Sequence, residues 1–280
     1  LPAARGGLGL RNIKQSPADD GVIQPPPVSL HVNTEDREKT CLGLLTQAPG
    51  FPDLPTEAAR FIAGGCHRRT AARDQLLYEK GETLTGFFVL LDGRVKLAVL
   101  SADGAERVLD IVLPGRTFAE SAALLGRPCP LYAQALTNSR LLFVELARVR
   151  EAMERWPAVG LAMLTLVAER NQRLTHDLEA CCLHSAAQRL AGYLLREAVS
   201  DADAPDAATV TLPAAKTVVA SSLNLSAETF SRELHGLAHH GLVSVDRRQI
   251  RIPSLKRLRV LAGEGPRATA PLAHRIASNG

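Results

Sequence analysis

The sequence predicts an α+β chain, in which a strand-rich N-terminal half is joined by one long helix to a small helical domain ending in a β-hairpin. Between about residues 73 and 146, short apolar runs alternate with glycine turns. From residue 159 onward, apolar residues recur at helical spacing. Between residues 211 and 252, two short helical patterns precede two short apolar runs. The 46% hydrophobic and 22% charged residues are typical of a globular protein.

These patterns predict five segments. They are a disordered arm at 1–40, a strand domain at 41–155, a long helix at 156–182, a helix-turn-helix domain at 183–262 and a disordered tail at 263–280. The arm and tail lack helical or strand periodicity, and the arm contains a run of three prolines. With no apolar run of about 18 residues and no signal-peptide pattern, we expect a cytoplasmic protein without a membrane partner.

The strand domain is predicted from apolar runs separated by tight turns. Phe87 to Leu91 is followed by Asp92-Gly93, and a second run from Val95 to Leu100 follows directly. Asp-Gly between two such runs is a strong hairpin signal. Repetition of this pattern predicts an antiparallel sandwich or barrel.

The long helix carries an apolar stripe with alternating steps of three and four residues. The stripe consists of Leu164, Val167, Asn171, Leu174, Leu178 and Cys181. This is a heptad seam, and a polar residue such as Asn171 on a seam sets the register of a two-stranded pairing. A dimerisation helix and a helix packed on its own domain both remain open at this point.

Five cysteines, without a C-x-x-C pair, predict a reducing compartment, mostly buried thiols and no metal site. Cys181 and Cys182 are adjacent on the long helix and therefore point to different faces. We expect them to pack in the core rather than to form a redox pair.

The C-terminal pattern predicts a winged helix-turn-helix. A short apolar helix ends near Leu223, and Asn224 suits the left-handed backbone of a tight turn. Ser226 is a good N-cap for the second helix, with Thr229 at the third helical position. The inner face of that helix is predicted to be Phe230, Leu234 and Leu237. The segment 242–252 then reads as a hairpin, which completes the motif.

Three side chains near the start of the second helix form a candidate reading head for DNA bases. Arg232 suits guanine, Glu228 can accept from cytosine, and Ser231 can contact several base edges. The alternative is an ordinary exposed ion pair between Glu228 and Arg232, four residues apart. Further DNA contacts are predicted for Ser226, Thr229, Arg247, Arg248 and Lys216. Residues 210–262 carry eight basic and three acidic side chains, which suits a phosphate backbone.

The segment from Leu225 to Leu234, with Gly241-Leu242-Val243 after it, resembles the CRP/FNR family of bacterial transcription regulators. The resemblance implies a jelly-roll sensor domain similar to cyclic-nucleotide-binding domains, a homodimer, and a transcription activator with RNA polymerase as partner rather than an enzyme. The form Glu228-Thr-Phe-Ser231-Arg232 is similar to the FNR and DNR branches. It implies a TTGA-containing palindrome and a link to oxygen, nitric oxide, anaerobic or denitrification control. Arg247 stands where the family often has glycine, so the shape of the wing turn stays open.

The effector is also left open. Cyclic AMP is not expected, because the Arg-Ser or Arg-Thr pair of cyclic-AMP binders is absent near Leu131 to Leu136. An iron–sulfur cluster is not expected, because only Cys41 lies near the arm. Haem, as in DNR-like members, stays open and would need an axial His or Cys. The candidate effector residues are Glu120, His67, Cys66 and His176, and each of the three His and Cys candidates has an ordinary structural reading as well.

Three other functions are alternatives to this one. A cyclic-nucleotide-responsive regulator remains the main alternative. A metal-binding cupin-type enzyme lacks ligands, because no His occurs between His67 and His176. A DNA-binding scaffold without an effector would not need so long a strand domain.

Overall fold

The structure is a computed structural model that describes residues 34–46, 48, 51, 53–101, 104–201 and 204–263, with side chains from residue 39 onward. The predicted tail beyond Gly263 and the predicted arm up to residue 33 lie outside the described residues. None of the described helices is both long and apolar enough to span a membrane.

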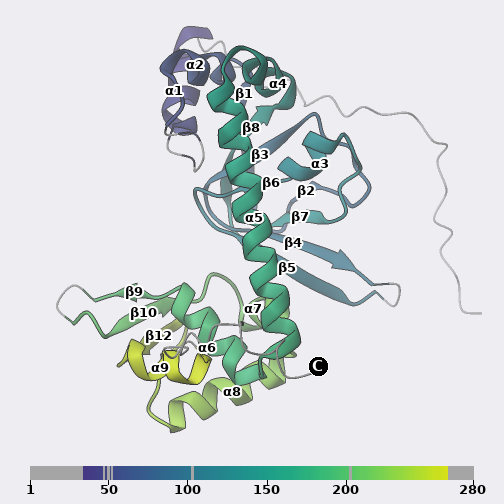
Figure 1. The fold of residues 1–280 in the computed structure, drawn as a ribbon. Helices are drawn as coiled ribbons and strands as arrows, with labels where there is room; N and C mark the ends of the chain where they lie inside the picture. The colour runs from purple at the N-terminus through teal and green to yellow at the C-terminus, as the bar shows by residue number, and fades with distance from the viewer. Residues whose placement is uncertain are drawn as a thin grey trace, which may run out of the picture. The chain divides into compact units, whose positions relative to one another are not determined.

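In the N-terminal half, the described residues form two four-stranded antiparallel sheets, with strand orders β1-β8-β3-β6 and β2-β7-β4-β5 (Figure 1). The strands are β1 (Cys66–Ala71), β2 (Leu76–Tyr78), β3 (Gly86–Asp92), β4 (Val95–Leu100), β5 (Glu106–Val112), β6 (Thr117–Phe118), β7 (Tyr132–Ala135) and β8 (Ser139–Glu145). The predicted antiparallel sandwich is confirmed. The hairpin expected at Asp92-Gly93 does not form, because β3 pairs with β6 and β8 in one sheet and β4 pairs with β5 and β7 in the other. Gly93 instead turns the chain from one sheet into the other with φ +92°, and a Cβ there would lie 2.3 Å from Ser139 Oγ, so the turn needs glycine.

Strand β3 is buried on both faces, which explains its unbroken apolar run. Phe88 and Leu90 enter the core between the two sheets, where they pack with Leu97 of β4. Phe87 and Val89 point to the other face, where helices cover the sheet. Because side chains alternate along a strand, a strand covered on both sides must be apolar at every position.

The helices over that sheet are α1 (Thr34–Leu45), α2 (Thr56–Ala63) and α4 (Leu146–Arg155). Helix α1 corrects the predicted arm, which was placed as far as residue 40. Its sequence is mostly polar, so periodicity does not reveal it. Tertiary contact stabilises it, since Cys41 and Leu45 are fully buried against the sheet. A further short helix, α3 (Glu120–Leu125), follows β6.

The long helix is α5 (Pro157–Leu183), with 27 residues and a length of roughly 40 Å. Pro157 occupies its first turn, where the missing N–H costs nothing. Val159, Met163 and Leu166 form the face that packs on the strand domain.

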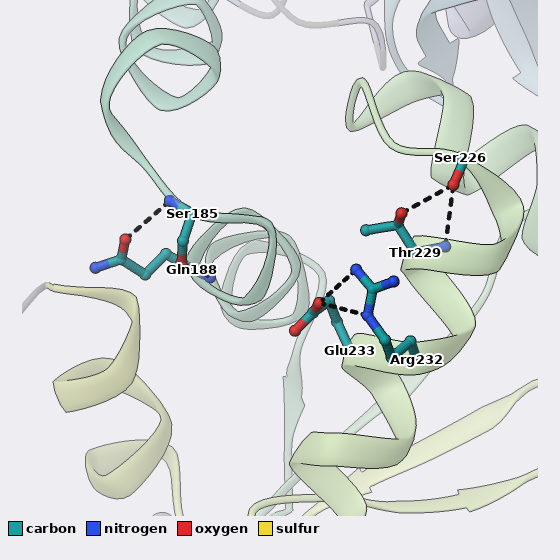
Figure 2. A network of polar contacts seen from close by, with 6 residues as sticks. All are labelled: Ser185, Gln188, Ser226, Thr229, Arg232 and Glu233. Carbon is teal, nitrogen blue, oxygen red and sulfur yellow. Dashed lines mark hydrogen bonds and ion pairs between the residues drawn. The ribbon is translucent and has the colours of Figure 1, made fainter.

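The described part of the C-terminal domain contains four helices and a small antiparallel sheet of order β11-β12-β10-β9. Its elements are α6 (Ala186–Arg196), β9 (Val199–Ser200), β10 (Ala208–Thr211), α7 (Lys216–Ser222), α8 (Ala227–His239), β11 (Ser244–Asp246), β12 (Gln249–Ile252) and α9 (Leu255–Ala262). A capping box starts α6, because Ser185 and Gln188 each satisfy the other's backbone N–H (Figure 2).

Helices α7 and α8, followed by the paired strands β11 and β12, confirm the predicted winged helix-turn-helix.

Candidate nucleic-acid interface

The turn between α7 and α8 is built as the residues predict. Asn224 has φ +53°, the left-handed conformation that lets the chain reverse between the helices. Ser226 Oγ accepts a hydrogen bond from the backbone N–H of Thr229 at 3.0 Å, and its hydroxyl donates to Thr229 Oγ1 at 2.9 Å (Figure 2). The N-cap is confirmed, and it fixes where α8 begins.

Helix α8 separates an inner apolar face from an outer polar face. Phe230, Leu234 and Leu237 are buried at 0–4% exposure, as predicted. Glu228 and Arg232 are exposed, and Ser231 is half-buried. The first two turns of α8 therefore present a carboxylate and a guanidinium to the outside, with a hydroxyl between them along the chain.

Arg232 pairs with its neighbour Glu233 rather than with Glu228. Arg232 Nη2 lies 3.2 Å from Glu233 Oε1, and Arg232 Nε lies 3.4 Å from the same oxygen (Figure 2). The alternative of a simple Glu228–Arg232 ion pair is thus not the arrangement observed. Because the Arg232 side chain is 65% exposed, its pairing is weak and easily exchanged for another acceptor.

The wing turn between β11 and β12 places Arg247 at φ +53°. A residue other than glycine costs roughly 1–2 kcal/mol in this conformation. Arg247 therefore adopts the left-handed backbone conformation that glycine usually supplies in such a turn, which answers the question of the turn's shape. Its charged side chain is exposed at the tip of the wing. All basic side chains of this domain between residues 210 and 262 are exposed, namely Lys216, Arg232, Arg247, Arg248, Arg251, Lys256, Arg257 and Arg259.

The predicted stripe on α5 is mostly uncovered. Leu164, Leu174 and Leu178 are 65%, 49% and 64% exposed, and Asn171 is exposed too. Val167 is half-buried. A different face of α5 packs on the strand domain, so packing among the described residues does not explain the stripe.

The expectation that Cys181 and Cys182 pack in the core is wrong. Both thiols are exposed, whereas Cys41, Cys66 and Cys129 are buried as predicted. The reason is tertiary: α5 extends past the strand domain, so its last turn has no core of that domain to enter.

Glu120 is a buried carboxylate at the start of α3. It is 1% exposed, and its Oε1 accepts a hydrogen bond from Arg170 Nη1 of α5 at 3.0 Å. Its other oxygen, Oε2, is buried with no partner among the described residues. Sequence reasoning missed Arg170. A signal existed, because Arg170 continues the spacing of Met163 and Leu166 and therefore lies on the inner face of α5.

The other candidate effector residues lie in separate environments. Cys66 Sγ donates to the backbone oxygen of Ile62 at 3.4 Å inside the core. His67 Nε2 lies 2.5 Å from Glu145 Oε1. His176 lines a cavity of about 390 Å³ at the end of α5. The structure does not bring these residues together with Glu120, and within the described ranges no three His, Cys, Asp or Glu side chains are grouped to hold a metal ion.

Two family models match the two halves. Residues 68–155 match the cyclic nucleotide-binding domain, and residues 188–261 match the Crp-like helix-turn-helix domain. Among curated proteins, the chain is 29% identical over 205 residues to the probable transcriptional regulator flp of Lacticaseibacillus casei, covering 73% of this chain and 91% of that one. It is 24% identical to the CRP-like cAMP-activated global transcriptional regulator of Mycobacterium tuberculosis, covering 66% of this chain and 84% of that one.

Among solved structures, FixK2 from Bradyrhizobium japonicum superposes with a TM-score of 0.63 at 23% identity, covering 70% of this chain and 96% of that one. This likeness supports the fold. Apart from the first two residues of β1, the sandwich lies within the segment that the first model matches, and the winged helix-turn-helix lies within the segment that the second model matches, with α5 between them. The chain therefore belongs to the CRP/FNR family of DNA-binding transcription regulators, whose members are not enzymes.

Proposed function

We propose that this regulator binds, as a homodimer, a palindromic DNA site of the TTGA-containing type, and that Glu228, Ser231 and Arg232 read its bases. The observation that carries the proposal is the outer face of α8. Its first two turns expose Glu228 and Arg232 while the cap at Ser226 holds the helix start in place. A helix that enters the major groove contacts base edges with residues near its N-terminus.

The exposed basic residues of the wing and of the flanking helices support a second kind of contact. Arg247 and Arg248 at the wing tip and Lys216 at the start of α7 are exposed. Side chains of this kind neutralise phosphates and position the protein, without reading sequence. Ser226 and Thr229 lie at the N-terminus of α8, where hydroxyl and backbone donors suit a phosphate.

We infer that the regulator acts in the cytoplasm with RNA polymerase as its partner, as an activator under oxygen, nitric oxide or denitrification control. The support is the Glu228-Thr-Phe-Ser231-Arg232 segment, which resembles the FNR and DNR branches. A transcription assay with the purified chain and a promoter carrying the palindrome tests activation directly.

The base-reading role is tested by comparing two arginine variants on a panel of sites, each changed at one base pair. We expect Arg232→Ala to relax discrimination at one position by about 1–3 kcal/mol. Arg247→Ala is the matched control. This variant should weaken binding to all sites alike. It should also reduce the slope of log K against log salt concentration by about one, because one fewer counterion is released on binding. The measurement is fluorescence anisotropy at fixed salt. Equal weakening of every site by both variants would contradict the role of Arg232.

A cyclic-nucleotide-responsive regulator is the second candidate. The buried Glu120 Oε2, which has no partner among the described residues, could accept a hydrogen bond from a ligand hydroxyl. Against it stands the missing arginine for the cyclic phosphate near Leu131 to Leu136. Calorimetric titration with cyclic AMP separates the two. Saturable binding that is lost in Glu120→Gln would favour this candidate, and no binding heat favours the first.

A further inference from the structure

Two of the five cysteines are open to chemistry. Burial, with a smaller contribution from Glu82, raises the pKa of the Cys129 thiol to about 11, and Cys41 and Cys66 lie fully inside the core. Cys181 and Cys182 are exposed in the last turn of α5. Reaction with a thiol oxidant needs an accessible thiolate, so these two are the sites where oxidation would start.

The two exposed thiols point in different directions, because neighbours on an α-helix differ by about 100°. Cys181 lines the cavity of about 390 Å³ that it shares with Gln188 and Gly192 of α6. Arg189 Nη1 also donates to the backbone oxygen of Cys181 at 3.3 Å. Cys181 therefore faces the chain's own C-terminal domain. Cys182 does not line this cavity.

Cys182 instead ends a second exposed stripe of residues on α5, which is rotated slightly from the predicted stripe and shares Leu164, Asn171 and Leu178 with it. Two rows of exposed residues, each with a spacing of seven, run along this face of the helix. The rows are Leu161, Ala168, Thr175 and Cys182, and Leu164, Asn171 and Leu178. Leu161, Leu164 and Leu178 are each 64–65% exposed, which is unusual for leucines aligned over five turns. The pattern is a heptad seam whose last member is Cys182.

The chemistry of the stripe fits a second copy of the chain. None of its seven residues is charged, and the charged side chains Glu169, Arg170 and Asp177 lie on other faces. In a two-fold parallel pair, each seam residue faces its own copy, so a charged seam would repel itself. The Asn171 amide has both a donor and an acceptor, so it can pair with its own copy.

We propose that Cys182 forms a disulfide with Cys182 of a second copy, which covalently closes the dimer at the C-terminal end of α5. This inference rests on the proposed homodimer. Two helix axes roughly 10 Å apart, with Cα atoms about 2.3 Å from each axis, bring facing Cα atoms to about 5 Å. Disulfides span Cα separations of about 4.4–6.8 Å, so the bond fits without backbone movement.

The oxidant is a low-molecular-weight disulfide such as glutathione disulfide. One Cys182 thiolate attacks it, the S–S bond breaks, and one glutathione thiolate leaves. The Cys182 thiolate of the second copy then attacks the protein sulfur of the mixed disulfide and expels the second glutathione. Two protein thiols are oxidised and one glutathione disulfide is reduced to two glutathione thiols, which take up the two protons that the protein thiols lose.

The bond would lie three residues before Ser185, which caps α6 and begins the C-terminal domain. It would therefore join the two DNA-binding domains at their point of attachment. When the two chains are linked and one DNA-binding domain has bound its half-site, the other domain meets the second half-site at an effective concentration on the order of millimolar. This effective concentration does not depend on the total protein concentration. Reduced protein diluted below its dimer dissociation constant loses DNA binding, whereas the linked dimer keeps it.

The test uses the full chain and the matched variants Cys181→Ser and Cys182→Ser, incubated with glutathione disulfide and run on non-reducing gels. We expect wild type and Cys181→Ser to form a species of about twice 30.0 kDa that dithiothreitol reverses, and Cys182→Ser to stay at 30.0 kDa. At tenfold dilution below the dimer dissociation constant, oxidised wild type should retain DNA binding that oxidised Cys182→Ser loses.

Sedimentation of the same samples in reducing buffer separates the two hypotheses. Dimers that do not cross-link, that cross-link through Cys181, or that stop at a mixed disulfide with glutathione overturn the disulfide and leave the homodimer intact. Monomers in reducing buffer overturn the homodimer itself, and the disulfide with it.

Discussion

Among single residues, Glu120 of the strand domain and Arg170 of α5 form an ion pair whose charges are costly to remove from water. The Glu120 side chain is 2% exposed and that of Arg170 is 17% exposed, so both charges are largely removed from water. The pair joins α3 to α5 across 50 residues of sequence. Removing one member of a buried pair leaves the other charge without compensation, which is costly.

We therefore expect Arg170→Ala to lower the free energy of unfolding by about 3–5 kcal/mol, measured by urea denaturation. The double variant with Glu120→Gln should recover part of the loss, because no bare carboxylate then remains. Arg127→Ala, which removes an exposed arginine near the same helix, is the control and should change stability by under about 0.5 kcal/mol. A loss below about 1 kcal/mol for Arg170→Ala would show that the pair is dispensable.

At the scale of elements, the start of α9 is held by a side chain from the loop before β10. The Asp206 carboxylate accepts hydrogen bonds from Ser254 Oγ at 2.7 Å and from the backbone N–H of Lys256 at 3.1 Å. These bonds, with the Ser254 hydroxyl foremost, hold the pKa of Asp206 below its usual value of 3.8. The loop and the helix are thus tied together by an ionised carboxylate at a helix N-terminus.

This contact predicts an acid-sensitive contribution to stability. Because the folded-state pKa of Asp206 is lowered, its contribution is present above about pH 4 and is lost as the pH falls through the folded-state value. Asp206→Asn should lower the melting temperature at pH 7, and its difference from wild type should shrink in acid. Thermal melts across pH 2.5–7, with Asp246→Asn as an exposed control, check this. If the difference in melting temperature between wild type and Asp206→Asn stayed constant with pH, the ionised Asp206 carboxylate would not be the group that stabilises this contact.

For the molecule as a whole, the main unexplained feature is one face of α5, which no other part of the described chain covers. Three of its leucines are about 65% exposed, although the same helix buries Val159 and Met163 on its opposite side. Pairing with a second copy would remove this apolar area from water at about 25 cal/mol per Å². It would also present two reading helices, as a palindromic site requires.

Charge placed on that face should prevent pairing. We expect Leu178→Glu, and equally Asn171→Glu, to give monomers in sedimentation, because two like charges would face each other across the seam. Glu169→Lys changes charge on another face and should leave dimers intact. Dimers in all three variants would mean that α5 is not the interface.

The local chemistry of the C-terminal domain was readable from its residues because each signal is short-range. Asn224 in the turn, Ser226 at the cap and the spacing of Phe230, Leu234 and Leu237 act over one or two helical turns. The alternating runs similarly predicted the antiparallel sandwich. Base-reading by Glu228, Ser231 and Arg232 stays a prediction, since it depends on a partner outside the chain.

The order of sandwich, long helix and winged helix-turn-helix can be predicted from the residues alone, because hydrophobic periodicity and turn residues reflect local backbone preferences. The tertiary structure alone decided which faces meet. It made α1 a helix within the predicted arm, brought Arg170 to Glu120, and left Cys181 and Cys182 exposed where core packing was expected. Each of these outcomes depends on contacts between segments distant along the chain, and local spacing carries no record of such contacts.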